Sequence, residues 1–514
     1  MLKQLSEQTI LNCLHSMVNN MKKQVFNPFL PLNEYIPDGE PHVFGDRVYL
    51  YGSHDCAAAE RFCIQDYTVW SAPVNDLSTW LCHGVTYKKS QDLRAQGVSP
   101  EKYPDYYAPD CVKGNDGKYY LYYAAMGPNI RPFGPMSVAV SSSPSGPFEY
   151  LGDIRNKDGS PLMTYLTNDP AVINDDGKIY LYYGWGLGRD FSNRIFSPLF
   201  SYVLSKLTKR STEEIKHTKP SVLSCAFAEL EKDMLTVKSG PKAVLDSKTT
   251  AKKGSELYRH PFYEAPSIRK FGDLYYLIYS SGENNELAYA TSRYPDKDFK
   301  YRGVIISNSD LGFKENDRPK NVSGTIHGSV EKINDKYYIF YHRCTNNTDF
   351  SRQACAEEIN ISDEGTIRQV EVTSCGLNGK PLESKGSYPA AICCNLYGRK
   401  MKKIGLKKHD KHCRIAEDDS EQFICGIEDG TVIGYKYFNF NGKARFSVSV
   451  SGSAAGKIEI LIDTEQKPIG EIKIMPSEKK TVLSSEIVFP TRKSAVYLRF
   501  KGTGKFNLYE IKFG

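Results

Sequence analysis

A short β-hairpin signature occurs five times in the sequence and constrains the fold more than any other feature. Each copy places a turn of Gly, Asp or Asn before a tyrosine-rich run of alternating residues, which is how a tight turn leads into a strand. The copies are FGDRVYLY (Phe44–Tyr51), NDGKYYLYY (Asn115–Tyr123), DDGKIYLYY (Asp175–Tyr183), FGDLYYLIY (Phe271–Tyr279) and INDKYYIFY (Ile333–Tyr341). Five similar hairpins predict five similar units, as in a β-propeller.

A polar residue precedes the hairpin tyrosine by ten to twelve residues in every unit. Counted from Tyr49, Tyr120, Tyr180, Tyr276 and Tyr338, these residues are Asp38, Asp110, Asp169, Glu264 and His327. If the units are blades around an axis, each polar residue lies where an innermost strand begins, and the five side chains converge on one pocket. A single Asp before a turn is more often a cap, so the expectation rests on the shared spacing.

Length and pattern together predict a second domain. The chain has 514 residues, more than one core usually supports. From about residue 415 it consists of alternating strands separated by Gly turns, which predicts a β-sandwich. We therefore expect an all-β fold, a five-bladed β-propeller followed by a C-terminal β-sandwich. The expected segments are an N-terminal arm (1–24), the propeller (25–398), a basic linker (399–414) and the sandwich (415–514).

The positive charge is concentrated in the predicted linker. The net charge is +7, and residues 399–414 hold eight Lys or Arg and one Asp, so the remaining chain is close to neutral. Nucleic-acid-binding proteins spread basic charge over a face, so we expect no nucleic-acid partner. The 13 cysteines show no C-x-x-C spacing, which predicts reduced thiols and neither a disulfide framework nor a zinc site.

No apolar run approaches the length of a membrane span, so we expect no membrane partner. The first residues lack the charged start, the apolar core and the small-residue cleavage site of a signal peptide. This pattern predicts a cytoplasmic protein, and a start upstream of Met1 would leave secretion open. The sequence leaves the oligomeric state open as well.

Three carboxylates from different blades, Asp38, Asp169 and Glu264, suit the cleavage of a glycosidic bond. One must be ionised to activate water, and one must be protonated to donate to the leaving oxygen. The third can keep the donor protonated by like-charge repulsion. In an inverting enzyme the base and the acid stand about 6.5 to 9.5 Å apart, with room for a water between them. A funnel-shaped propeller axis provides such space.

The sequence resembles glycoside hydrolase family 43 from about Asn27 to Tyr397. The motifs that carry the resemblance are the first-blade Asp38, APD (Ala108–Asp110), Asp169 before the DDGK turn, EAP (Glu264–Pro266) and GTIHGS (Gly324–Ser329). Members of this family are five-bladed β-propellers with an inverting mechanism, so the resemblance implies that fold and that mechanism here.

Carried over to this chain, the resemblance makes Asp38 the general base, Asp169 the pKa modulator and orienting group, and Glu264 the general acid. Glu40 is a rival for the base, because PDGEP stands where the family more often has A-D-P. The seven-residue distance from Asp38 to the turn residue Gly45 favours Asp38.

Six further residues are candidates for substrate binding: Asp110, Tyr107, His54, Trp185, His327 and Arg343. Asp110, in the APD motif, would line the pocket or support the residues that do, and Tyr107, just before this motif, stands where the family often has Trp. The others can stack on a sugar or hydrogen-bond to it, with plain packing as the alternative for each. His327 could instead orient a water or ligate an axial calcium ion, although Ca²⁺ prefers oxygen ligands. We expect no required cofactor and leave a structural calcium ion open.

The C-terminal domain resembles carbohydrate-binding module family 6 through GYKYFNF (Gly434–Phe440) and FKGTGKFNLYEIKF (Phe500–Phe513). It contains no Trp, the usual stacking residue of such modules. Sugar binding would therefore need Tyr435, Tyr437 or Phe506 in that role. A purely structural domain is the alternative.

These observations predict an exo-acting, inverting α-L-arabinofuranosidase and/or β-D-xylosidase. Its expected substrates are oligosaccharides of arabinan or arabinoxylan from the plant cell wall, and the sequence does not separate the two sugars. Three alternatives stay open: an endo-arabinanase of the same family, a non-catalytic carbohydrate-binding propeller, and a propeller that binds other proteins.

Overall fold

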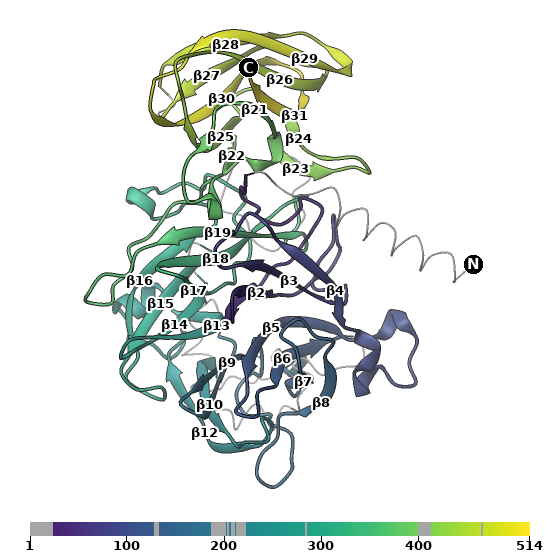
Figure 1. The fold of residues 1–514 in the computed structure, drawn as a ribbon, viewed down its shortest axis with the longest axis vertical. Helices are drawn as coiled ribbons and strands as arrows, with labels where there is room; N and C mark the ends of the chain where they lie inside the picture. Colours follow the sequence, from purple (N-terminus) through teal and green to yellow (C-terminus); the bar gives the residue numbers. More distant parts are fainter. Residues whose placement is uncertain are drawn as a thin grey trace.

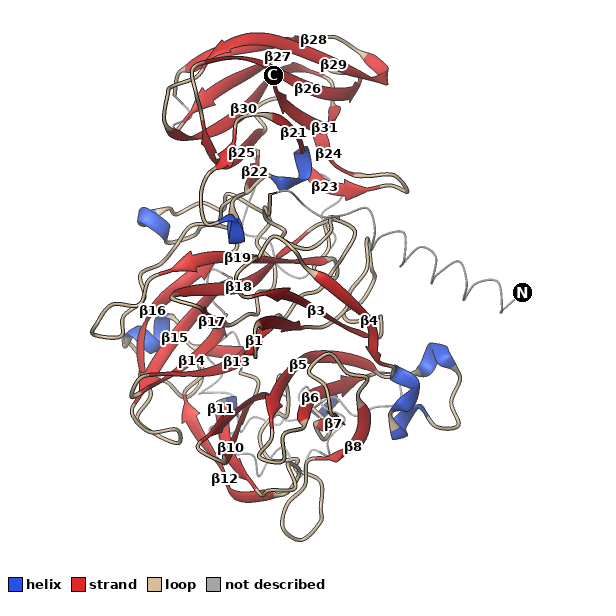
Figure 2. Ribbon diagram, viewed as in Figure 1, coloured by secondary structure: helices blue, strands red, loops and turns tan. Residues whose placement is uncertain are grey.

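The computed structural model describes residues 24–514 except for 128–132, 187–222, 283–284, 399–412 and 464–465; within 187–222 only residues 202, 205, 206 and 211 are placed. The predicted N-terminal arm and most of the basic linker therefore lie outside the described residues. The described chain is mainly β-sheet and forms a larger body and a smaller C-terminal body (Figures 1 and 2). Its defined helices are short: η1 (Lys89–Gln91), η2 (Leu93–Ala95), η3 (Pro100–Lys102), α4 (Glu256–Arg259), η5 (Phe313–Glu315), η6 (Gly376–Asn378) and η7 (Ala390–Ile392).

Within the described residues, the larger body consists of five antiparallel sheets whose strand order follows the sequence. The first sheet contains β1 (Glu40–Phe44), β2 (Arg47–Tyr51), β3 (Tyr67–Pro73) and β4 (Leu81–Tyr87). The second contains β5 (Asp105–Lys113), β6 (Tyr119–Met126), β7 (Ser137–Ser141) and β8 (Glu149–Asp153). The third contains β9 (Ala171–Asp175), β10 (Lys178–Tyr183), β11 (Cys225–Leu230) and β12 (Val237–Leu245).

The fourth and fifth sheets complete the ring. The fourth contains β13 (Phe262–Phe271), β14 (Leu274–Ser281), β15 (Glu286–Ser292) and β16 (Lys300–Ser307). The fifth contains β17 (Val330–Ile333), β18 (Lys336–Cys344) and β19 (Arg352–Ile359). Each of the five predicted hairpins forms the first two strands of one sheet, which confirms the prediction of five similar units.

Apolar cores lie between successive sheets, and together they close a ring. One core joins the first and second sheets, and the next three join the second to the third, the third to the fourth and the fourth to the fifth. A further core joins the fifth sheet back to the first. A stack of sheets would leave its two ends uncovered, so this arrangement establishes a five-bladed propeller.

The abundance of tyrosine follows from how the blades pack. Hairpin tyrosines lie in the cores between blades and reach polar partners in a neighbouring loop. The hydroxyl of Tyr51 donates to Pro144 O at 2.6 Å, that of Tyr122 to Met234 O at 2.8 Å, and that of Tyr182 to Pro295 O at 2.5 Å. A phenylalanine would fill the same space but leave a buried carbonyl without its donor.

The N-terminal segment closes the ring from outside the fifth blade. The backbone N–H of Phe29 donates to Ala354 O in β19. The Asn27 side chain donates to Ala356 O and Thr373 O and accepts from the Ala356 N–H. Residues 27–29 therefore run along β19 where the other blades have a fourth strand, and they tie the start of the propeller to its end.

The smaller body is a sandwich of two sheets. One sheet contains β20 (Leu382–Glu383), β22 (Asn395–Tyr397), β25 (Val432–Asn439), β27 (Ala455–Ile462), β28 (Pro468–Ile474) and β30 (Lys493–Thr503). The other contains β21 (Gly386–Pro389), β23 (Arg414–Glu417), β24 (Gln422–Ile427), β26 (Lys443–Gly452), β29 (Ser477–Val488) and β31 (Phe506–Phe513). The predicted β-sandwich is thus present.

The sandwich begins earlier than the predicted boundary at residue 415. Strands β20, β21 and β22 pair with β25 and β31, and their side chains belong to the sandwich core. Residues 382–397 therefore complete the sandwich instead of closing the propeller. These three strands are short, and their few alternating positions gave no signal that they belong to the later sheets.

Two further expectations concern the whole chain. The 12 cysteines among the described residues are free thiols. No helix in the described ranges has the length and apolarity needed to cross a membrane.

Candidate active site

A residue with left-handed backbone occurs in four of the blades, just before the innermost strand in the first and third and at a bulge within that strand in the second and fourth. These residues are Asp38 (φ 57°), Ala108 (φ 39°), Asp169 (φ 47°) and Ala265 (φ 59°). Glu264 immediately precedes Ala265, and His327 precedes β17 of the fifth blade. Four of the five residues predicted to converge, Asp38, Asp169, Glu264 and His327, therefore lie in one layer at one end of the propeller axis.

Asp110 lies one layer deeper along the axis. It follows the left-handed Ala108 by two residues, as Glu40 follows Asp38. Its side chain is fully buried: Oδ1 is 2.6 Å from His42 Nε2, and Oδ2 accepts from the Val172 N–H at 2.7 Å. The structure thus does not bring Asp110 to an exposed pocket surface.

Asp38 is held as a carboxylate. Its Oδ1 accepts a hydrogen bond from Arg352 Nη1 at 2.8 Å, and the residue is only 4% exposed. Burial is the largest single influence and opposes ionisation. Arg352 is the strongest of several groups that act against it, and together they lower the pKa of Asp38 to about 2. The backbone N–H of Asp38 donates to His342 Nδ1 at 3.3 Å, so His342 is neutral there and its Nε2–H donates to Thr325 O.

Asp169 and Glu264 form a coupled pair of carboxyl groups. Asp169 Oδ2 accepts from the Ala265 N–H at 3.0 Å, which joins the third blade to the residue after Glu264. Burial and the charges of Glu264 and Asp38 raise the pKa of Asp169 well above its usual value. Burial and the charge of Asp38 raise the pKa of Glu264 to about 7. At neutral pH this pair keeps a proton beside an ionised Asp38.

The electrostatics give the carboxyl groups of Asp38 and Glu264 opposite chemical roles. Asp38 is ionised over the whole physiological range and can accept a proton from water. Glu264 is half-buried, holds a proton up to about neutral pH and can donate it. Environments that push two carboxyl pKa values apart are the pattern of acid–base catalysis.

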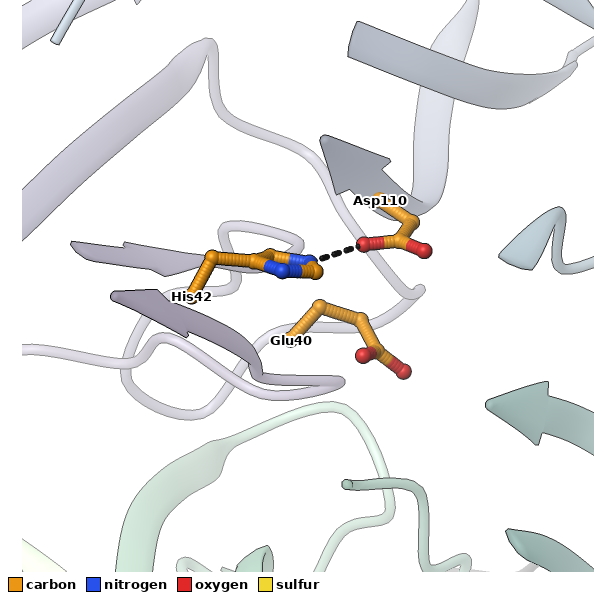
Figure 3. Close-up of side chains that lie close together, drawn as sticks. All are labelled: Glu40, His42 and Asp110. Carbon is orange, nitrogen blue, oxygen red and sulfur yellow. Dashed lines mark hydrogen bonds and ion pairs between the residues drawn. The ribbon is translucent and has the colours of Figure 1, made fainter. Parts of the chain in front are cut away.

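Glu40, the rival candidate for the base, belongs to a separate buried group with His42 and Asp110 (Figure 3). Its Oε2 accepts from Arg269 Nη2 at 2.9 Å and from Ser267 Oγ at 3.1 Å. Burial raises the pKa of Glu40 to about 8, although Arg269 acts against it. Glu40 therefore lies beneath the catalytic layer and is a poor proton acceptor at neutral pH.

The Glu40–His42–Asp110 group does not fit a calcium ion. Ca²⁺ takes six to eight oxygen ligands, whereas this group offers two carboxylates and an imidazole. The His42 and Asp110 ligand atoms are 2.6 Å apart and already hydrogen-bonded to each other. A cation there would have to displace that bond.

His327 lies between the catalytic layer and the layer beneath it. Its Nδ1 is 3.8 Å from Asp38 Oδ1, and its Nε2 is 3.9 Å from Glu40 Oε1. Both His327 Nε2 and Glu40 Oε1 are buried and lack a hydrogen-bond partner among the described residues. One nitrogen and one oxygen leave most of a calcium ion's coordination to water, so calcium at His327 stays a prediction.

Comparison with known proteins now places the chain in a family. The model of "Glycosyl hydrolases family 43" matches residues 27–367, which span the propeller and contain all three carboxylates. The chain belongs to this family. It is therefore a glycoside hydrolase, as the motifs around Asp38, Asp169 and Glu264 had indicated.

Curated relatives agree with the family assignment. A protein from Thermoclostridium stercorarium described as "Xylosidase/arabinosidase" is 39% identical over 504 residues, which cover 95% of this chain and 98% of the relative. A "Beta-xylosidase" from Xylanibacter ruminicola is 28% identical over 354 residues, covering 66% of this chain and 98% of the relative. The first match extends through the sandwich, and the second corresponds in length to the propeller alone.

A solved structure supports the fold. The family 43 subgroup 1 enzyme from Xanthomonas citri, crystallised with xylose, aligns with a TM-score of 0.50 and 23% identity, covering 70% of this chain and 95% of that chain. At this level of identity the likeness concerns the fold alone. It is consistent with the ring of five blades described above.

Two of the predicted sugar contacts in this family 43 chain lie beside the catalytic layer. Trp185 Nε1 donates to Glu264 Oε2 at 3.1 Å, and its half-buried ring packs against Phe133 and Tyr263. Tyr107 immediately precedes Ala108, the place that Glu264 has in the fourth blade. Its half-buried ring packs against Phe62.

The remaining two candidates, His54 and Arg343, are hydrogen-bonded to other groups. His54 Nδ1 donates to Asp66 O at 2.8 Å, and its Nε2 is 3.9 Å from Glu34. Arg343 donates to Gln353 Oε1 and to Cys393 O, at the seam with the sandwich. Strand alternation explains Arg343, because its neighbour His342 in β18 points towards Asp38 and Arg343 therefore points the opposite way.

Sequence reasoning missed the cation that sets the charge of Asp38. Arg352 is the first residue of β19, and no hairpin or motif singles it out. Sequence reasoning also missed Phe62, whose ring centroid lies 4.6 Å from the guanidinium carbon of Arg352. Successive residues of a strand point to opposite faces. In YHR (Tyr341–Arg343) this alternation was the available signal that His342, and not Arg343, faces the site.

The aromatic residues proposed to bind sugar in the sandwich are packing residues or bonded internally. Tyr435 and Phe506 belong to the buried core of the sandwich. The hydroxyl of Tyr437 donates to Glu371 Oε1. Tyr435 and Phe506 therefore offer no exposed stacking face of the kind that sugar-binding modules use, and the half-buried ring of Tyr437 has Lys493 Nζ 4.3 Å from its centroid.

Proposed function

We propose that this family 43 chain is an exo-acting, inverting glycosidase that releases α-L-arabinofuranose or β-D-xylose from arabinan or arabinoxylan oligosaccharides. The observation that carries the proposal is the pairing of an ionised Asp38 with a protonated Glu264 in one layer of the axis. A binding propeller has no need for two carboxyl groups with opposite protonation states.

The reaction follows from these states in one displacement. Asp38 accepts a proton from a water molecule as the water oxygen bonds to the anomeric carbon. The bond from that carbon to the leaving oxygen breaks, and Glu264 donates its proton to the leaving oxygen. Asp38 ends protonated and Glu264 ionised, and exchange with solvent resets both groups. Attack from the side opposite the leaving group inverts the anomeric configuration.

Asp169 supports the acid in this scheme. Its repulsion with Glu264 is mutual, so its carboxyl favours a proton on the pair at neutral pH. The hydrogen bond from the Ala265 N–H fixes Asp169 against the backbone that carries Glu264. No step requires a metal ion or an organic cofactor.

The choice of sugars rests on relatives. The proteins from Thermoclostridium stercorarium and Xylanibacter ruminicola are described as a "Xylosidase/arabinosidase" and a "Beta-xylosidase". A more distant relative from Bacillus subtilis, 22% identical over 534 residues that cover 92% of this chain and 88% of the relative, is described as an "Arabinoxylan arabinofuranohydrolase". Pentosides of the plant cell wall are therefore the substrate class to test first.

The test uses purified protein on 4-nitrophenyl α-L-arabinofuranoside and 4-nitrophenyl β-D-xylopyranoside, with the variants Asp38→Asn and Glu264→Gln. We expect hydrolysis of at least one substrate, a loss of at least about 100-fold in Asp38→Asn and a smaller loss in Glu264→Gln, because 4-nitrophenolate leaves with little help from an acid. Proton NMR of the xyloside reaction should show α-xylose first. Wild-type rates in both variants, or β-xylose as the first product, would overturn the proposal.

A further inference from the structure

The loop after the second strand of the first blade contains a buried carboxylate with no role in the mechanism above. Asp55 is fully buried. Its Oδ1 accepts from the Cys63 N–H at 2.9 Å, and its own N–H donates to Tyr35 O. It belongs to the YGSHD stretch (Tyr51–Asp55) that follows the first hairpin.

Asp55 binds the guanidinium that holds the general base. Arg352 Nε donates to Asp55 Oδ2 at 2.7 Å, and Arg352 Nη2 donates to Asp55 Oδ1 at 3.1 Å. The Arg352 backbone N–H also donates to Asp55 Oδ2, at 3.2 Å. The remaining arm of the guanidinium, Nη1, is the one that reaches Asp38. A fork bound at two nitrogens has a fixed plane, so Asp55 determines where Nη1 points.

This chain of contacts crosses the seam between the first and the fifth blade. Around it, Ser351 Oγ donates to Cys56 O at 2.8 Å, and Thr348 Oγ1 donates to Ala59 O at 3.4 Å. The loops that carry Asp55 and Arg352 are thus bonded to each other at several points. The two ends of the ring meet at the group that pairs with the general base.

The burial of this group makes its geometry important. The side chains of Asp38, Asp55 and Arg352 are 6%, 0% and 5% exposed. Water cannot replace a lost contact there, and a buried charge without its partner is costly. Without its hydrogen bonds to Asp55, the Arg352 guanidinium would not stay aligned on Asp38.

We infer that Asp55 is a positioning residue for hydrolysis, which acts on the general base Asp38 by aiming the Arg352 guanidinium. The inference rests on the proposed function, because it assigns Asp55 to the base of that reaction. None of the described hydrogen bonds joins Asp55 to Asp38, so its positioning effect passes through Arg352, while the two carboxylates also repel each other directly.

The test is a double-mutant cycle between Asp55→Asn and Asp38→Asn, read as kcat and KM on an aryl pentoside with an activated leaving group. In the wild-type background we expect Asp55→Asn to lower kcat by about 10- to 100-fold with KM nearly unchanged. In the Asp38→Asn background it should change kcat by less than about twofold, because the base it serves is absent. Loss of folded protein alone would give the same factor in both backgrounds.

A matched control comes from a second buried carboxylate with the same fork. Asp92 is fully buried and binds Arg94 Nε at 2.7 Å and Nη2 at 2.6 Å, away from the catalytic layer. Asp92→Asn should lower the melting temperature and leave kcat per folded molecule unchanged. If Asp55→Asn behaves in the same way, the inference is wrong.

A second variant tests the same link if Asp55→Asn folds poorly. Arg352→Lys keeps the positive charge, but one ammonium group cannot bind Asp55 at two points and still reach Asp38. We expect a kcat loss of about 10-fold or more, and wild-type kcat would overturn the inference. Failure of the proposed function looks different: Asp38→Asn itself would then retain full activity.

Discussion

Arg352 Nη1 lies 2.8 Å from Asp38 Oδ1 and joins the last blade of the propeller to the carboxylate at the start of the first. This contact is the strongest of the influences that keep Asp38 ionised despite its burial. The only way for Glu264 to serve as the acid is to hold a proton beside that charge, and its raised pKa does so. The propeller thus supplies opposite protonation states from separate blades.

The pH dependence of kcat/KM follows from these two groups. The reaction needs Asp38 ionised, with a pKa of about 2, and Glu264 protonated, with a pKa of about 7. Activity should be nearly constant in weak acid and fall about tenfold per pH unit above neutrality, as Glu264 loses its proton. Steady-state rates from pH 4 to 9 measure this. An activity that rises through pH 7 would contradict the assignment of Glu264.

Trp185 should affect the pH at which kcat/KM falls on the alkaline side of its pH profile, here called the basic limb. Its indole N–H donates to Glu264 Oε2, which favours the ionised acid and lowers its pKa. In Trp185→Phe the basic limb of kcat/KM should therefore move to higher pH, by up to about one unit. Trp80→Phe is the control, since Trp80 Nε1 donates to Leu77 O instead. Equal shifts in the two variants would exclude a specific role for Trp185.

The stability of the ring should depend on Asn27. Its side chain bonds to Ala356 in β19 and to Thr373 O, and the residue is 3% exposed. Asn27→Ala leaves several buried groups without partners and should cost about 2 to 4 kcal/mol in the free energy of unfolding. Denaturant unfolding measures this. Asn156→Ala, in a partly exposed turn, should change stability by less than about 0.5 kcal/mol, and equal losses would contradict closure by residues 27–29.

Removal of metal ions should not affect the reaction. The mechanism proposed above has no step through a metal, and the Glu40–His42–Asp110 group does not fit calcium. Dialysis against EDTA should leave kcat/KM within about twofold, with or without added calcium. A loss that calcium restores would show that an ion takes part. A change in melting temperature alone would indicate a structural ion.

Much of the fold could be predicted from the sequence because the hairpins are local. A turn and the strand of alternating tyrosines after it are formed by consecutive residues, so a short stretch of sequence identifies them. Five copies imply a ring. The boundary of the sandwich was harder to predict, because β20, β21 and β22 have two to four residues each and pair with strands 35 or more residues later. Such distant pairing leaves no periodic signal.

The candidate site shows the same contrast. Asp38, Asp169 and Glu264 stand next to hairpins, so spacing from the hairpin identified them. Spacing could not show that Asp110 lies one layer deeper, because two residues along a strand keep the side chain on the same face. Arg352 comes from the start of a third strand and depends on how the first and the last blade meet, which no local pattern records.

The assignment of the acid and the base is tested most directly by the leaving group. Rates of Glu264→Gln and Asp38→Asn are compared on phenyl and 2,4-dinitrophenyl glycosides of the preferred pentose. Glu264→Gln should lose about 10²- to 10⁴-fold on the phenyl glycoside and recover most of its rate on the dinitrophenyl glycoside, which leaves without a proton. Asp38→Asn should lose a similar factor on both. Equal losses for Glu264→Gln on the two substrates, or recovery by Asp38→Asn, would contradict the account.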